Sequence, residues 1–152
     1  MPNFEEILPL ADRMKKLYTK TCRTVCKRYG FSQTEFDILG FLGDKNGLDT
    51  AIEIAKNRPI KKANISTSVE RLTKEGYLKR RTDSKDRRLI HLELTEKAAE
   101  PLAEIKESQE KFFSLFFSGI SKEEIKTYKN ITKKLILGME EKLKINDEGS
   151  VL

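Results

Sequence analysis

The sequence has little of what most metal sites, disulfide frameworks and membrane spans are built from. It contains two cysteines, one histidine and no tryptophan among 152 residues. One histidine without CxxC or HExxH spacing leaves little basis for a zinc site or a histidine-based catalyst. No apolar run approaches the roughly 20 residues that cross a bilayer, and the first residues are acidic where a secretory signal would be basic. We therefore expect a cytoplasmic protein without metal, cofactor or membrane contact.

The positive charge is concentrated in one segment of the chain. Thirty basic and 24 acidic residues give a net charge of +6. Between Lys56 and His91, twelve basic residues stand against four acidic ones, a net +8 that leaves −2 for the other 116 residues. Such an excess favours a polyanionic partner, because each neutralised phosphate releases counterions. A lysine-rich solvated surface is the alternative. The arginines favour phosphate, because the N–H groups of the planar guanidinium fork match the geometry of the phosphate oxygens.

Apolar spacing and capping signals predict a largely helical chain. Three capping boxes begin helices, at Ser32–Glu35, Thr50–Glu53 and Ser121–Glu124. The apolar residues recur every three or four positions between these signals, as in amphipathic helices. The predicted helices span 3–29, about 33–42, a short stretch between Thr50 and Pro59, 61 or 62 to 74, the stretch from after Thr95 to Phe117, and the stretch from the third box to about Leu143.

Residues 77–95 have the pattern of a β-hairpin. The segment 77–82 is typical of a strand, 83–86 is rich in turn formers, and 88–95 alternates apolar and polar side chains. Two short helices followed by a basic hairpin are the elements of a winged helix-turn-helix, whose second helix enters the major groove. We therefore predict a mainly α (α+β) fold, a winged helix-turn-helix with further helices at both ends.

The predicted helix 62–74 has one apolar face and one face suited to DNA. Ile65, Val69 and Leu72 form the apolar face. Opposite this face lie Ala63, Thr67 and Lys74, with Asn64, Ser66 and Arg71 on the flanks. Such small, hydrogen-bonding or basic side chains can approach base edges and phosphates. An ordinary surface helix rich in Ser and Thr is the alternative. The candidate DNA-binding residues of this segment are Lys61, Lys62, Ala63, Asn64, Ser66, Thr67 and Arg71.

Several of these segments carry a family signature. The run 70–80 (ERLTKEGYLKR), then 83–88 (DSKDRR), closing on Leu94-Thr95, resembles the core signature of the MarR (multiple antibiotic resistance regulator) family. The segment 31–36 (FSQTEF) resembles the family's entry into its second helix. The order and lengths of the elements agree with this family along nearly the whole chain.

The resemblance implies roles for the turn of the hairpin. Arg88 would be the wing arginine that enters the minor groove, held in place by Asp86, and Lys85 and Arg87 would contact the DNA backbone. An arginine in a narrow groove meets an enhanced negative potential, and a paired carboxylate orients its fork. A solvated Asp86–Arg88 turn pair is the alternative.

The resemblance also implies an obligate homodimer formed by the terminal helices. Four phenylalanines within six residues cannot all face one small core, although a large intramolecular core is the alternative. The last predicted helix adds further apolar positions. We predict a dimerisation region at 1–30 and 101–145, a DNA-binding region at 31–100 and a flexible tail at 146–152. The apolar residues are Phe112, Phe113, Phe116, Phe117, Ile125, Tyr128, Ile131, Leu135, Ile136, Met139 and Leu143.

The function implied is sequence-specific regulation of transcription. We expect a homodimeric repressor that binds double-stranded DNA at a pseudo-palindromic operator. The resemblance implies that a small aromatic or phenolic acid can release the DNA, although the motifs assign no ligand residues. The alternative is a winged helix used for protein contact or for non-specific nucleic-acid binding. No nucleophile–base constellation, phosphate loop or metal spacing supports an enzyme.

The cysteines and the histidine lie outside this signature. Cys22 and Cys26 face roughly the same side of the first helix, and buried packing is preferred over thiol sensing. Leu8 stands about where relatives that sense oxidants carry a cysteine. His91 alternates outward from the apolar face of its strand, which predicts a solvated or phosphate-adjacent side chain rather than a metal ligand. Ala98, where relatives usually have glycine, could alter the hinge between the two regions.

Overall fold

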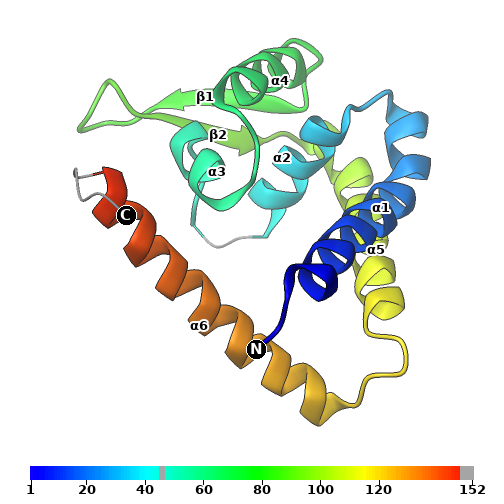
Figure 1. The fold of residues 1–152 in the computed structure, drawn as a ribbon. Coiled ribbons are helices and arrows are strands. Elements are labelled where there is room, and N and C mark those ends of the chain that lie inside the picture. Colours follow the sequence, from blue (N-terminus) through cyan, green and yellow to red (C-terminus); the bar gives the residue numbers. More distant parts are fainter. Residues whose placement is uncertain (45–46, 148–152) are drawn as a thin grey trace. The chain divides into compact units, whose positions relative to one another are not determined.

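The computed structural model describes residues 1–44 and 47–147 and is mainly helical with one two-stranded antiparallel sheet, as predicted (Figure 1). The last helix continues beyond its predicted end near Leu143, and residues 148–152 of the predicted tail lie outside the described residues. The elements are α1 (Phe4–Tyr29), α2 (Gln33–Gly43), α3 (Ala51–Asn57), α4 (Lys62–Lys74), β1 (Leu78–Thr82), β2 (Ile90–Leu94), the 3-10 helix η1 (Glu96–Ala98), α5 (Ala99–Phe116) and α6 (Lys122–Asp147).

The helix boundaries follow from local chemistry. All three predicted capping boxes are present, with the serine or threonine oxygen accepting the N–H of the glutamate three residues later. Each glutamate in turn accepts the N–H of the capping residue. Gly30 ends α1 at φ 70°, a left-handed conformation that glycine adopts without steric cost. The termini of α2 and α3 are therefore fixed by hydrogen bonds, which matters for the elements that pack on them.

The chain divides after Phe116 into two compact units, and the hydrophobic core described here belongs to the first. In that unit α1 packs along α5, and α2 contacts α4, α5 and β2. Helix α4 buries Ile65, Val69 and Leu72, the three positions predicted from its spacing. Because this face is fixed in the core, the opposite face of α4 points to solvent.

The hairpin is joined to the helical core by a third extended segment. Strands β1 and β2 pair in antiparallel register from Leu78↔Leu94 to Thr82↔Ile90. On its other edge β2 pairs with the residues before α3, through a bridge between Thr50 and His91 and a 2.8 Å bond from Leu92 N–H to Asp49 O. The middle and turn-side part of β2 is therefore tied to the start of α3.

Apolar side chains remain exposed on the helices at both ends of the chain. Phe112 is buried whereas Phe113 is 55% exposed, which confirms that the phenylalanines do not all enter one core. In the second unit, α6 exposes Ile131, Leu135 and Met139. None of the helices in the described residues is long and apolar enough to cross a membrane.

The Thr50→Ala variant is expected to lower the free energy of unfolding by about 1 kcal/mol, because it removes the cap of α3. The Thr50 hydroxyl accepts from Glu53 N–H and donates to the Glu53 carboxylate over 3.0 Å. Urea unfolding of both proteins at equal concentration measures the difference. Thr67→Ala is the control: its hydroxyl is exposed and bonds to the Ala63 carbonyl of its own helix, so a change within about 0.5 kcal/mol is expected. Equal losses in the two variants would contradict the capping role.

Candidate nucleic-acid interface

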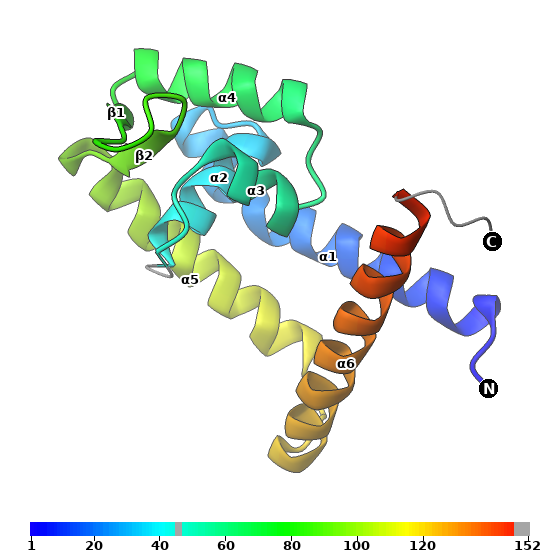
Figure 2. The ribbon, with the colours of Figure 1, turned by 90° about the vertical axis from the view of Figure 1, so that its left-hand side faces the viewer.

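Helix α4 and the hairpin lie at the same end of the first unit. Figures 1 and 2 both show α4 next to β1 and β2, with α1 and α5 extending away from them. Helix α4 contacts β1 directly and also packs on α2 and α3. The solvent face of α4 and the turn of the hairpin are thus carried by one packed scaffold.

The amino-terminal half of α4 presents the side chains that the sequence singled out. Helix α4 starts at Lys62, and its N-cap residue Lys61 makes no side-chain cap bond. The positive end of the helix dipole therefore lies beside two exposed lysines, a favourable place for phosphate. Six of the predicted positions are exposed: Lys61, Lys62, Ala63, Asn64, Ser66 and Thr67.

Arg71 has partners inside the protein that the sequence did not predict. Its guanidinium lies 2.8 and 3.0 Å from the two carboxylate oxygens of Glu35, which is buried. It also donates to Glu75 and to the Gly30 carbonyl, each over 2.9 Å. Glu35, and after it Glu75, raise the pKa of Arg71. Arg71 thus joins α4 to the junction of α1 and α2, and its contact with DNA remains a prediction.

The turn of the hairpin is held by its own aspartates. Asp83 Oδ1 accepts the N–H groups of Lys85 and Asp86, both over 2.8 Å. These bonds, with the contact to His91, lower the pKa of Asp83 to about 2. The carboxylate is therefore ionised at neutral pH and fixes the backbone that carries Lys85, Arg87 and Arg88.

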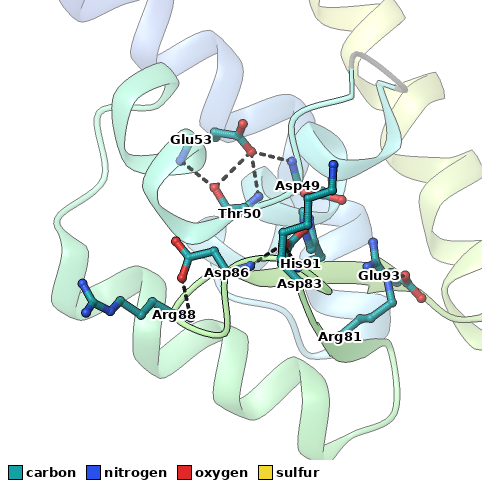
Figure 3. A network of polar contacts seen from close by, with 10 residues as sticks. Asp49, Thr50, Glu53, Arg81, Asp83, Asp86, Arg88, His91 and Glu93 are labelled. Atoms are coloured by element: carbon teal, nitrogen blue, oxygen red, sulfur yellow. Dashed lines mark hydrogen bonds and ion pairs between the residues drawn. The ribbon is translucent and has the colours of Figure 1, made fainter.

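Asp86 acts on Arg88 differently from the prediction. Its carboxylate accepts the backbone N–H of Arg88 over 3.0 Å, and Figure 3 shows the Arg88 side chain extending away from it. Within residues 1–44 and 47–147, no carboxylate forms an ion pair with the Arg88 guanidinium. The two side chains are close in sequence, but the tight turn uses the carboxylate to cap its own backbone. Asp86 therefore positions the arginine through the main chain.

The base of the hairpin neutralises part of its own charge. Glu93 on β2 pairs with Arg81 over 2.5 Å and with Lys79 over 3.1 Å, both on β1. Positive charge that is not paired in this way lies at Arg80 and in the exposed turn. Apart from Arg80 on β1, the positive charge of the hairpin that Glu93 does not pair with thus lies in the turn.

His91 is not a solvated side chain, contrary to the prediction. Its ring is 17% exposed and lies between Asp49 and Asp83, with Nδ1–Oδ1 and Nε2–Oδ2 distances of 2.6 and 3.1 Å (Figure 3). The alternation of side chains along β2 correctly predicted that His91 points to the side of the strand opposite to Leu92. It could not show that residues 49–50 cover that face. No group of three or more potential metal ligands suited to an ion occurs in the described part of the chain.

The two cysteines lie on the inner side of α1. Cys22 is fully buried, and burial raises the pKa of its thiol and that of Cys26, the latter to about 11. Both side chains are therefore protonated thiols at neutral pH, the less reactive form. This environment favours the packing role over oxidant sensing.

Helices α2 to α4 pack together and are followed by a basic hairpin, and the solvent face of α4 is exposed beside this hairpin. This arrangement defines a winged helix-turn-helix protein. The MarR family model matches residues 29–89, which contain α2 to α4 and the hairpin turn. The chain is thus similar to transcriptional regulators of the MarR family.

Relatives and solved structures extend this likeness over the whole chain. The transcriptional repressor MprA of Escherichia coli K12 is 28% identical over 152 residues, covering 98% of this chain and 85% of MprA. A putative MarR family regulator from Listeria monocytogenes, solved with a 26mer DNA, shares the fold with a TM-score of 0.82 at 16% identity, covering 100% and 99% of the two chains. BpsR of Bordetella bronchiseptica shares it with a TM-score of 0.68 at 19% identity, covering 89% and 96%. These relatives are described as regulators rather than enzymes.

Proposed function

We propose that the chain is a homodimeric repressor that binds a pseudo-palindromic operator with α4 in the major groove and the hairpin turn against the adjacent minor groove. The main observation that supports this proposal is that the exposed start of α4 and the exposed basic turn lie on one packed scaffold. A helix and a hairpin presented together can contact two neighbouring grooves of one duplex. The structural neighbour from Listeria monocytogenes was solved in complex with a 26mer DNA, and MprA is a transcriptional repressor, which supports this assignment.

Base reading would fall to the exposed side chains at the start of α4. Asn64, Ser66 and Thr67 can donate and accept hydrogen bonds to base edges, and Ala63 leaves room for close approach or contact with a thymine methyl. Lys61 and Lys62 would neutralise phosphates beside the groove. Arg71, tied to Glu35, would chiefly hold the angle of α4 and reach DNA only at its margin.

The hairpin turn would supply the second contact. Arg88 would enter the minor groove, where a narrow groove concentrates negative potential around an arginine. Lys85 and Arg87 would contact the flanking phosphates, while Asp86 holds the turn from behind. The ordered backbone of this turn supports the assignment, since a pre-shaped loop loses less conformational freedom on binding.

Dimerisation would use the terminal helices, with 1–30 and 101–145 as the dimer region and 31–100 as the DNA-binding region. The amino-terminal half of α1 exposes Phe4, Ile7 and Leu8, and α6 exposes Ile131 and Leu135, each at 50% or more. Large apolar side chains that are exposed together on one helix support a role for that helix in contact with a partner. A two-fold dimer would place two copies of α4 about one turn of DNA apart.

Release by a small aromatic acid is the remaining part of the proposal. DNA binding by BpsR is regulated by 6-hydroxynicotinic acid, and the shared fold supports a similar response here. Such a ligand would act by preferring a spacing of the two DNA-binding regions that does not fit the operator. The regulator would do this in the cytoplasm, where the operator DNA is.

Selection of binding sites from random duplex DNA tests the proposed function. We expect enrichment of a pseudo-palindromic sequence that is bound at least about 1,000-fold more tightly than bulk DNA at physiological salt. Affinities measured across salt concentrations distinguish this sequence-specific binding from non-specific binding to nucleic acid. Bulk binding with a steep salt dependence and no enriched sequence would favour the non-specific alternative.

A further inference from the structure

The single histidine of the chain joins the hairpin turn to the start of α3. Asp49, the residue before the α3 cap, approaches Nδ1, and Asp83, the first residue of the turn, approaches Nε2 (Figure 3). Asp83 uses its other oxygen to hold the backbone of the turn. The N–H of Asp49 donates to Glu53 of the α3 capping box over 2.7 Å. A continuous chain of polar contacts therefore runs from the turn to α3.

The chemistry of this arrangement requires a positive ring. Ionised carboxylates only accept hydrogen bonds, and a neutral imidazole has a single N–H to donate. Only the imidazolium form can donate to Asp49 and Asp83 together. A neutral ring with its proton on Nδ1 would keep the 2.6 Å contact to Asp49 and would turn a lone pair toward Asp83.

We propose that protonated His91 is a positioning residue that clasps the hairpin turn to α3, and that loss of its proton releases the turn and weakens DNA binding. The second half of this inference rests on the proposed function, because it assumes that the turn contacts DNA. The first half concerns the free protein alone. The two halves can be tested separately.

The charged groups around the ring favour the clasp near neutral pH. Asp49 and then Asp83 raise the pKa of His91 above its ordinary value, while Arg81 on β1 acts in the opposite direction. Glu93 pairs with Arg81 and so offsets part of its charge. The carboxylate of Glu53 on α3 also interacts with the charge of the ring, which contributes to lowering the pKa of Glu53.

The direction of the pH effect follows from this raised pKa. The proton favours the folded, clasped form, so the clasp is complete below the ordinary histidine pKa near 6.5 and is lost as the pH rises through the higher folded value. Asp83 stays ionised throughout, because its own pKa lies near 2. Between pH 6 and pH 9 the affinity for DNA should therefore fall, on the order of fivefold.

Nuclear magnetic resonance of the free, full-length protein tests the clasp directly, since one imidazole gives one titration. We expect a His91 pKa above 6.5, a lower value in Asp49→Asn, and backbone amides of residues 83–89 that are ordered at pH 6 and mobile at pH 9. A pKa at or below 6.5, or amides unchanged across the titration, would overturn the proposal.

Two variants extend the test to DNA, using the duplex enriched by selection at fixed ionic strength. His91→Gln should remove the pH dependence and bind at every pH as weakly as the wild type does at pH 9. Asp83→Asn should also lose the pH dependence but bind tightly at pH 9, because its amide can donate to a neutral ring while its oxygen still accepts from the turn. If the NMR results hold but wild-type affinity does not change with pH, the link to DNA is overturned. If no duplex binds at any pH, the proposed function fails while the clasp stands.

Discussion

Replacing Leu135 with aspartate is expected to turn the proposed dimer into a monomer and to weaken binding to the selected duplex by about 100-fold or more. Leu135 is 59% exposed on α6, one turn from Ile131 and from Met139. A dimer would bury this stripe, and a buried carboxylate without a partner is costly. Without the dimer, the two half-sites no longer bind as a linked pair, and the gain from effective concentration is lost. Sedimentation equilibrium and fluorescence anisotropy measure the two effects.

Asn130→Asp is the matched control for this variant. It adds the same charge to the same exposed helix, about 140° around the helix axis from Leu135. The control should remain dimeric and should keep its affinity for the selected duplex. If Leu135→Asp also stays dimeric, or if both variants dissociate equally, the apolar stripe of α6 is not the dimer interface.

Arg88→Ala is expected to weaken binding to the selected duplex by about 1–3 kcal/mol and to relax the sequence preference where the turn contacts DNA. The side chain extends from a turn whose backbone is fixed by Asp83 and Asp86. The alanine variant lacks the positive charge and the planar guanidinium that would enter the groove, and it leaves the backbone of the turn unchanged. Anisotropy titrations across salt concentrations measure the change in affinity and in the number of ions released.

Two further variants show what Arg88 contributes. Arg88→Lys keeps the charge but not the planar fork, so an intermediate affinity is expected if the groove recognises the guanidinium. Arg13→Ala removes the same charge from an exposed position on α1 and should leave the affinity nearly unchanged. Wild-type affinity in Arg88→Ala would remove Arg88 from the interface.

The local elements of this fold could be predicted because their causes are local. Ser32 and Thr50 cap helices through bonds that span three residues, and Ile65, Val69 and Leu72 share a face because of helical spacing. The exposure of the predicted α4 residues follows from the same spacing, since burying one face leaves the other in solvent.

The contacts that fix the interface could not be predicted in this way. Glu35 meets Arg71 across 36 residues, and His91 meets Asp49 across 42. Helical or strand spacing gives a side chain its direction but not what lies there after the chain has folded. His91 points to the predicted side of β2, yet that side is covered because the segment before α3 pairs with the strand edge. The same limit applies to Asp86, whose carboxylate caps a backbone N–H instead of the neighbouring guanidinium.

Footprinting on the selected duplex tests the central claim, that α4 reads the major groove and the turn enters the minor groove of one symmetric site. Dimethyl sulfate reports guanine N7 in the major groove, and hydroxyl radicals report the sugar backbone along the minor groove. We predict two symmetric patches of N7 protection about 10 base pairs apart. Minor-groove protection should flank both patches and should disappear in Arg88→Ala. A single patch, or uniform protection along the duplex that Arg88→Ala does not alter, would contradict this account.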